Sequence, residues 1–289
     1  MTVAELSSGK DKDDENFPVA SILIRPRHRP VIHAFYRFAR AADDVADNST
    51  APVEGKLALL EGMRASLTAE SSSSREAAAL REALLERGLS TQHGLDLLEA
   101  FRRDVTKLRY ADWPDLLGYC RYSAMPVGRF VLDVHGESRS TWLASDALCA
   151  ALQVINHLQD CGKDYRTLNR VYIPLDRFSR AGLDPQVLAQ QESPPALLNV
   201  IADLAQQVSW LLEQSRPFAS QIRDHRLATE VSVIQALAES LTDRLRWRDP
   251  LADRVHHTKV EALMIALGSA GRSLFLRSIS KSPTKMVRI

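Results

Sequence analysis

The chain has 289 residues, of which 45% are hydrophobic and 25% are charged, and its formal net charge at pH 7 is +1. This composition is typical of a globular protein with a sizeable core rather than of a disordered chain or a membrane bundle. The balanced charge and the lack of a nucleic-acid-binding motif argue against nucleic acid as a partner.

The cysteines and the N-terminal segment bear on the cellular compartment. Cys120, Cys149 and Cys161 are odd in number and lack the spacing of metal ligands, which favours a reducing compartment. Residues 1–15 are polar and lack the apolar run of a signal peptide. No stretch approaches the roughly 18 apolar residues that a membrane span requires. We therefore expect a cytoplasmic protein.

Hydrophobic periodicity predicts helices along most of the chain after a disordered lead-in over residues 1–15. Pro18 is expected to start a short helix, and a longer one runs from Val31 to Asp47, with apolar residues at helical spacing. No run alternates with period two, so the sequence predicts an all-α single domain of roughly ten helices. Further helices are expected from Pro52 and over 75–87, 92–108, 114–132 (kinked at Pro126), 141–163, 194–213, 217–247 and 250–277, with a loop over 165–174.

Two acidic clusters stand out because each places two aspartates four residues apart within a predicted helix, at Asp43 and Asp47 and at Asp160 and Asp164. That spacing puts both carboxylates on one helix face. The second cluster continues a polar stripe that begins with Gln153 and Asn156. Carboxylate and amide oxygens suit Mg²⁺, which commonly bridges to phosphates. Two such helices facing each other would hold a diphosphate, whereas a lone acidic pair is also compatible with a solvated surface.

Four ordered elements resemble the squalene and phytoene synthases, which join prenyl diphosphates head to head. The similarity covers residues 16–174 well and the C-terminal third loosely. It implies an isoprenoid-synthase helical bundle around a central apolar cavity, spanning residues 16–278, with a basic tail over 279–289. The elements are Tyr36, Arg40, Asp43, Asp44 and Asp47; the stretch 119–128; Gln153, Asn156, Asp160 and Asp164; and the stretch 169–174.

The resemblance also implies roles for individual residues. Catalytic roles fall to Asp43, Asp47, Asp160, Asp164 and Tyr122. Mg²⁺ ions that bridge to the diphosphate would be bound by Asp43, Asp47, Asn156, Asp160 and Asp164. Substrate contacts are implied for Asn16, Tyr36, Arg40, Gln153, Gln159 and Arg170.

Several of these residues, and some of their neighbours, have a structural interpretation as well. The aromatic side chains of Tyr36, Phe38 and Tyr122 would either line the cavity and stabilise a cation or belong to the core. Asn16 would serve as a helix N-cap before Pro18. Asp104 falls where phytoene synthases carry an aspartate, and it could equally pair with Arg103 or Lys107. His157 is expected to be a packed histidine rather than a ligand.

Within the family, the stretches 15–20 and 123–129 are most similar to the bacterial hydroxysqualene synthases of the hopanoid pathway. These lyases act on a carbon–oxygen bond and convert presqualene diphosphate and water to hydroxysqualene and diphosphate. Other enzymes of that pathway make the substrate and reduce the product. Gln159 replaces a usual arginine, and a glutamine cannot hold a second diphosphate as an arginine would. Together with Pro126 in place of a usual glycine, this favours a single-diphosphate substrate.

Two other functions remain open from the sequence. The first is a sister activity that condenses two farnesyl diphosphates to presqualene diphosphate or squalene, or makes a phytoene-type product. The second is a catalytically silent helical scaffold whose acidic residues lie on the solvated surface and bind no ligand. The segment 259–289 combines apolar residues with Arg272, Arg277, Lys281, Lys285 and Arg288. It would either lie peripherally on the inner, anionic membrane surface or form a packed helix with a basic tail.

Overall fold

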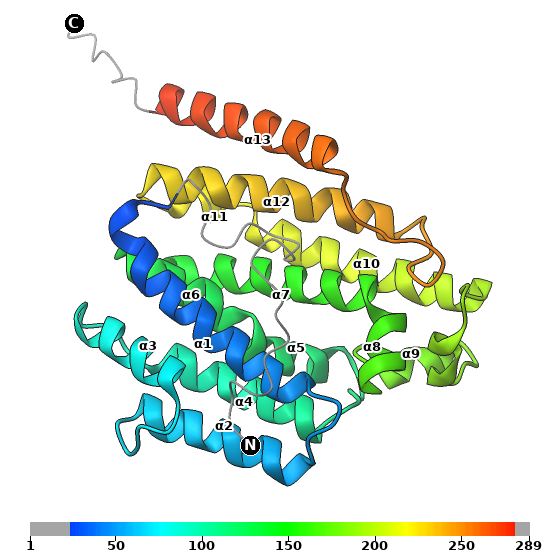
Figure 1. Ribbon diagram of the computed structural model, residues 1–289. Helices are drawn as coiled ribbons and strands as arrows, with labels where there is room; N and C mark the ends of the chain where they lie inside the picture. The colour runs from blue at the N-terminus through cyan, green and yellow to red at the C-terminus, as the bar shows by residue number, and fades with distance from the viewer. Residues whose placement is uncertain (1–23, 281–289) are drawn as a thin grey trace, which may run out of the picture.

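The computed structural model describes residues 24–280, with side chains described as far as Gly271, and is built from helices joined by short connections (Figure 1). Within this range there is no β-strand, and a single backbone bridge joins Arg109 to Val171. The predicted all-α fold class is therefore confirmed. The α-helices are α1 (Arg29–Asp47), α2 (Val53–Leu67), α3 (Arg75–Leu85), α4 (Gln92–Thr106), α5 (Trp113–Ser123), α6 (Met125–His135), α7 (Trp142–Gln159), α8 (Cys161–Leu168), α9 (Leu175–Arg180), α10 (Pro195–Ser215), α11 (Phe218–Gln221), α12 (His225–Leu245) and α13 (Lys259–Ser280).

Helix ends follow ordinary capping chemistry. The side chains of Ser74, Asp112 and Asp224 accept hydrogen bonds from backbone N–H groups at the starts of α3, α5 and α12, which satisfies donors that a helix leaves unpaired. The helix α6 ends at Gly136, whose φ of 68° is left-handed and favours glycine. The caps at Ser74 and Asp112 lie next to the predicted starts of the helices at residues 75 and 114.

Three predicted helices are broken in the structure, and one of them, over 141–163, divides at Asp160 into α7 and α8. The stretch 114–132 divides at Ala124 into α5 and α6, because Pro126 in the first turn of α6 has no N–H to continue the preceding helix. The stretch 217–247 divides into α11 and α12 where Glu137 accepts the backbone N–H groups of Arg223 and Asp224. A distant carboxylate that replaces a helical hydrogen bond is invisible to local periodicity.

Smaller differences lie near the second acidic cluster and the C-terminus. The predicted loop over 165–174 begins only after α8, which ends at Leu168, and α13 begins at Lys259 rather than at Pro250. The predicted lead-in over residues 1–15, the short helix at Pro18 and residues 281–289 lie outside the described residues.

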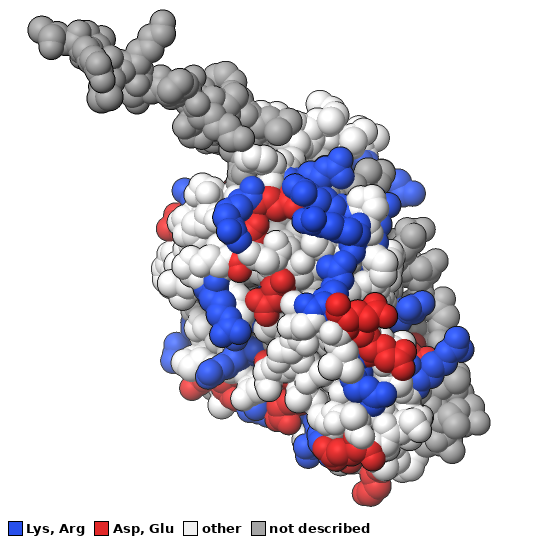
Figure 2. All heavy atoms as spheres, turned by 90° about the vertical axis from the view of Figure 1, so that its left-hand side faces the viewer, with Lys and Arg blue, Asp and Glu red and all other residues white. Residues whose placement is uncertain are grey.

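Two hydrophobic clusters form the core and meet along a cavity. One cluster joins α1, α2, α3 and α4 with part of α6, and the other surrounds α7, α10 and α12. Figure 1 shows α7 running through the middle of the molecule, with α10 and α12 on one side and α1 and α6 on the other. Helix α13 packs along α12. Figure 2 shows acidic and basic side chains interspersed over one face of the molecule.

Candidate active site

The cavity between the two clusters has a volume of about 550 Å³, a size typical of ligand-binding pockets. Its walls come from both clusters and are mostly apolar. Four aspartates lie in the lining, and three of them define one end: Asp43 and Asp47 of α1 and Asp164 of α8, with Asp104 of α4 behind them. We call this the acidic end of the cavity. The remainder is lined by apolar residues that include Ile32, Phe35, Phe130, Val131, Leu148, Leu152, Leu227, Val231 and Ile234.

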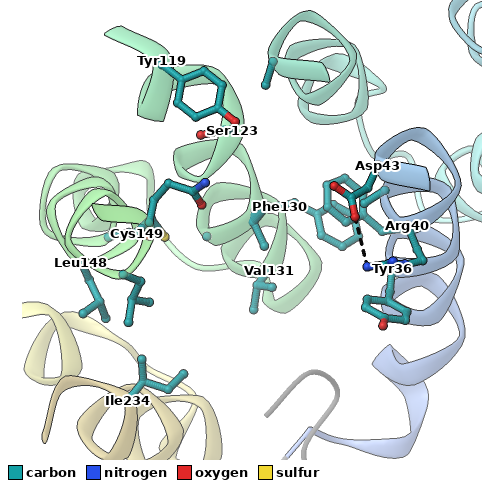
Figure 3. Close-up of a pocket in the computed structure, with 18 of the residues that line it drawn as sticks. Tyr36, Arg40, Asp43, Tyr119, Ser123, Phe130, Val131, Leu148, Cys149 and Ile234 are labelled. Atoms are coloured by element: carbon teal, nitrogen blue, oxygen red, sulfur yellow. Dashed lines mark ion pairs between the residues drawn. The ribbon is translucent and has the colours of Figure 1, made fainter. Parts of the chain in front are cut away.

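Helix α1 carries a polar stripe along the cavity. Tyr36, Arg40, Asp43 and Asp47 all line it, at spacings of four, three and four residues that keep them on one helix face. Figure 3 shows Tyr36, Arg40 and Asp43 on α1, across the cavity from residues of α5 and α7. The guanidinium of Arg40 contacts Asp43 at 3.0 Å and Asp44 at 2.8 Å. Arg40 therefore holds the Asp43 carboxylate in place from within the same helix.

A second arginine holds Asp47. Arg170 is buried and donates a hydrogen bond to the Asp47 carboxylate at 2.5 Å, so the two form an ion pair. Its other N–H groups donate to the backbone oxygens of Asp104 at 3.0 Å and Ala46 at 3.1 Å. One guanidinium thus ties the end of α1 to α4 and to the loop after α8. Sequence resemblance predicted Arg170 as a substrate contact, and it lies in the cavity lining beside the acidic end.

A buried polar cluster lies behind the acidic end. Asp104 accepts hydrogen bonds from the hydroxyls of Tyr119 and Tyr172, both at 2.8 Å. The ring of His157 stacks on Tyr172 with 3.5 Å between centroids, and its Nε2 lies 3.0 Å from the Gln153 amide nitrogen. All five residues lie in or beside the cavity wall, so Asp104 belongs to the buried cluster rather than to a solvated pair.

Burial, and next the nearby carboxylates, raise the pKa values of Asp43 and Asp164, and burial also raises that of Asp104. The pKa of Asp43 rises to about 7, chiefly because the carboxyl is desolvated and next because Asp47 is close, while Arg40 opposes the shift. The pKa of Asp164 also rises to about 7, through desolvation and then through Asp160. Desolvation raises the pKa of Asp104 to about 6. Burial lowers the pKa of His157 to about 3, so this imidazole is neutral and packed, as expected.

The acidic end offers the kind of ligands that Mg²⁺ prefers. Carboxylate oxygens from two helices line one cavity, and burial raises the pKa values of Asp43 and Asp164, so a bound cation would stabilise their charged forms. Among the described residues, no three His, Cys, Asp or Glu side chains are already close enough together to form a metal centre. The donor set fits Mg²⁺, which is usually bound through one or two carboxylates together with water and substrate phosphates.

The remaining predicted site residues lie elsewhere. Tyr122 packs under the guanidinium of Arg103, 4.2 Å from its ring centroid, and is absent from the cavity lining. Phe38 is fully buried in the core. Asn156 is also outside the lining, and Asn16 lies outside the described residues.

The side chains of Gln159 and Asp160 line a second hollow rather than the cavity. Gln159 is buried and donates a hydrogen bond to the backbone oxygen of Val255. Both residues line a separate polar hollow of about 430 Å³, together with Lys163 and the segment 250–256. The polar residues predicted to form one continuous stripe therefore lie on two helices. Helix α7 ends at Gln159, Asp160 joins the two helices, and Asp164 on α8 lines the cavity. Gln159 consequently does not reach the acidic end, so its side chain does not bear on how many diphosphates the cavity holds.

Sequence reasoning missed several residues that the cavity uses. Tyr119 and Tyr172 hold Asp104, and Ser123 lines the cavity one turn beyond Tyr119. All three fall inside stretches that carried the family resemblance, which was the available signal. Spacing alone did not single them out, because their partner Asp104 is on another helix and Tyr172 lies outside any helix.

Comparisons with known proteins agree with this architecture. The squalene/phytoene synthase family profile matches residues 10–261. Hydroxysqualene synthase from Rhodopseudomonas palustris is 54% identical over 282 residues, which cover 98% of this chain and 97% of the relative. The same-named enzyme from Zymomonas mobilis is 55% identical over 277 residues, which cover 95% and 93%. Squalene synthase HpnC from Alicyclobacillus acidocaldarius superposes with a TM-score of 0.71 at 30% identity, covering 84% of this chain and 91% of that chain.

The helical bundle and its cavity thus have the fold of solved isoprenoid synthases. The chain belongs to the squalene/phytoene synthase family. The predicted resemblance to hydroxysqualene synthases is confirmed over nearly the whole chain.

Proposed function

We propose that this protein converts presqualene diphosphate and water to hydroxysqualene and diphosphate in an Mg²⁺-dependent reaction. The observation that carries the proposal is the cavity itself, which combines an acidic end with a long apolar remainder. Such a cavity accepts a diphosphate at one end and hydrocarbon chains at the other. The near-full-length relatives named hydroxysqualene synthase support the particular reaction.

The chain's own residues bind the substrate and shield it from water. Arg40 and Gln153 line the cavity near the acidic end and contact diphosphate oxygens, and Arg170 keeps Asp47 in position. Loss of diphosphate leaves a cyclopropylcarbinyl cation, which rearranges before water captures it. The apolar walls exclude bulk water during this interval. Tyr36 and the stacked pair of Phe35 and Phe130, 3.9 Å between centroids, place ring faces beside the cation.

Asp43, Asp47 and Asp164 are the residues that would hold Mg²⁺, with Asp160 and Asn156 joining them if α7 and α8 straighten. When bound, the metal supplies positive charge that stabilises the departing diphosphate. Arg40 and Arg170 orient the two carboxylates of α1 for this purpose.

Product identification tests the proposal. Purified protein is incubated with presqualene diphosphate and Mg²⁺ without nicotinamide, and the products are analysed by mass spectrometry. Hydroxysqualene and one equivalent of diphosphate are expected. Recovery of unreacted substrate under conditions where the protein is folded would overturn the proposal.

A second activity is favoured by one comparison, the similarity to a solved protein named squalene synthase. It would condense two farnesyl diphosphates to presqualene diphosphate or squalene. Incubation with farnesyl diphosphate and Mg²⁺, with and without NADPH, separates the two activities. Formation of presqualene diphosphate or squalene would favour this second activity.

We also propose that the protein contacts the inner, anionic face of the membrane peripherally. We further propose that it exchanges substrate and product with other enzymes of its pathway in the cytoplasm. None of the described helices is long and apolar enough to cross a bilayer. Helix α13 nevertheless turns large apolar side chains to solvent, with Val260, Leu263, Met264 and Leu267 each more than half exposed. Residues 259–289 contain six Lys or Arg and one Glu, which complements anionic lipid. Co-sedimentation with anionic but not neutral vesicles, lost in the variant Leu263→Ser/Leu267→Ser, tests this contact.

A further inference from the structure

The cavity wall formed by α5 contains a hydroxyl group without a partner. Ser123 is the last residue of α5 and lines the cavity. Its Oγ is buried and has no hydrogen-bond partner among the described residues. Buried hydroxyls are almost always hydrogen-bonded, so an unpartnered one that faces a cavity indicates a polar group bound there when the cavity is filled.

The position of Ser123 along α5 places it at the boundary between the two parts of the cavity. Tyr119, four residues earlier and on the same helix face, donates to Asp104 behind the acidic end. Ser123 therefore lies one turn, about 6 Å, further along α5 than the residue that contacts this cluster. Figure 3 shows Ser123 and Tyr119 on one side of the cavity, across from Arg40 and Asp43 on α1.

This location matches the place of the reacting carbon. A diphosphate held near Asp43 and Asp47 puts the carbon that bears it just inside the apolar part, opposite α5. A water molecule hydrogen-bonded to Ser123 Oγ would face that carbon while the surrounding wall stays apolar. A single hydroxyl can retain one water there without opening the cavity to bulk solvent.

Another serine in the same wall differs in its environment. Ser145 of α7 is fully buried, and its hydroxyl lies beside the Cys149 thiol at the point where α6 crosses α7. A Cβ added to Gly128 of α6 would lie 2.5 Å from Ser145 Oγ and 2.6 Å from Cys149 Sγ. Ser145 also lines the cavity, and its Oγ likewise has no hydrogen-bond partner among the described residues. It packs where α6 crosses α7, against Gly128, whereas Ser123 lies on α5 across the cavity from α1. The pair gives a matched comparison of two serine hydroxyls in one wall.

We propose that Ser123 holds the water molecule that captures the rearranged cation, so that it is a positioning residue that directs the reaction to the alcohol. The inference rests on the proposed function. In the capture step, a lone pair of the water oxygen forms the new C–O bond to the cationic carbon. The proton lost from that oxygen passes to the diphosphate released in the first step, so charge and atoms balance without a further reactant.

The test compares Ser123→Ala, Ser123→Thr and the control Ser145→Ala with presqualene diphosphate and Mg²⁺ in ¹⁸O-labelled water. Two quantities are measured for each protein: the rate of diphosphate release and the share of hydroxysqualene among C30 products. For Ser123→Ala we expect diphosphate release close to the wild-type rate. The ratio of hydroxysqualene to alkenes and other alcohols should fall about three- to tenfold, the effect of one lost hydrogen bond. Threonine should restore the ratio, and Ser145→Ala should leave it unchanged.

The outcomes separate this inference from the proposed function. If the wild-type protein forms no ¹⁸O-labelled hydroxysqualene, the proposed function fails and the inference fails with it. If wild type forms it and Ser123→Ala gives the same product ratio, the inference alone is overturned. A parallel loss of diphosphate release, thermal stability and product, with the ratio unchanged, would show a packing role and would also overturn it.

Discussion

The two acidic pairs look alike in sequence and differ in structure. Asp43 and Asp47 lie on the continuous helix α1, both line the cavity, and each is paired with an arginine. Asp160 is the residue between α7 and α8, and Asp164 lies within α8. Of the two, only Asp164 lines the cavity. The cation nearest Asp160 is Lys163, at 3.9 Å.

One half of the acidic end is therefore preorganised and the other is not. Two arginines hold the first pair before any ligand arrives, which avoids part of the entropy cost of binding. Among the residues that the structure describes, the ion pair shown for the second pair is that of Asp160 with the exposed Lys163. We infer that α1 provides a fixed platform for the diphosphate and that α8 is the element that adjusts when Mg²⁺ and substrate bind.

The largest effect is expected from removing a charge on the fixed platform. Asp43→Asn or Asp47→Asn should lower kcat/KM about 10³-fold or more, because metal-borne stabilisation of the leaving group is worth several kcal/mol. Steady-state assays with presqualene diphosphate measure the loss. Asp203→Asn, at an exposed position of α10, is the control and should match wild type. Wild-type activity in Asp43→Asn would instead favour the scaffold interpretation.

A comparison within the second pair tests whether α8 adjusts. If the bend at Asp160 persists during turnover, Asp164→Asn should reduce kcat/KM about 10²-fold and Asp160→Asn no more than about tenfold, since only the former removes a cavity carboxylate. Equal losses in the two variants would show that the helix straightens and brings both carboxylates to the metal. Either result identifies the arrangement in which the reaction occurs.

The anchor itself contributes to stability. Arg170→Met should reduce the free energy of unfolding by about 3–5 kcal/mol, because it leaves the Asp47 carboxylate and two backbone oxygens without their buried partner. Urea denaturation measures this change. Arg64→Met removes solvent-exposed pairs with Glu61 and Glu70 and should leave the midpoint almost unchanged. A midpoint shift of the same size in both variants would contradict the anchoring role.

The smallest effect concerns pH. Because the pKa values of Asp43 and Asp164 are raised to about 7, protons compete with Mg²⁺ below that pH. The apparent Mg²⁺ affinity should therefore fall about tenfold as pH is lowered from about 8 to about 6. Mg²⁺ titrations of activity at fixed ionic strength check this. An affinity that is constant across this range would mean that these carboxylates are ionised throughout.

Much of the fold was predictable because its signals are local. The helical spacing from Val31 to Asp47 and the polar break at residues 71–74 placed α1 and α3 close to their observed bounds. The breaks at Ala124 and at residues 222–224 were not predicted. The second break depends on Glu137, which is more than 80 residues away in the chain. Tertiary hydrogen bonds of this kind leave no periodic trace.

The sequence predicted which residue types form the site but not the direction in which each side chain points. Spacing correctly placed Asp43 and Asp47 on one helix face, and the family motif added Tyr36 and Arg40, which line the same cavity. The same reasoning failed to place Gln159 and Asp160, since the bend between α7 and α8 turns them away from the cavity. Asp104 stayed ambiguous because its partners Tyr119 and Tyr172 are remote in sequence.

The contacts of Arg170 have a consequence for local opening. Its guanidinium joins residues 46 and 47, residue 104 and the loop after α8. None of these segments can separate from the others without breaking hydrogen bonds at one shared buried group. Amide hydrogen exchange around the acidic end should therefore proceed by one cooperative opening, with similar protection at the end of α1, in the last turn of α4 and after α8.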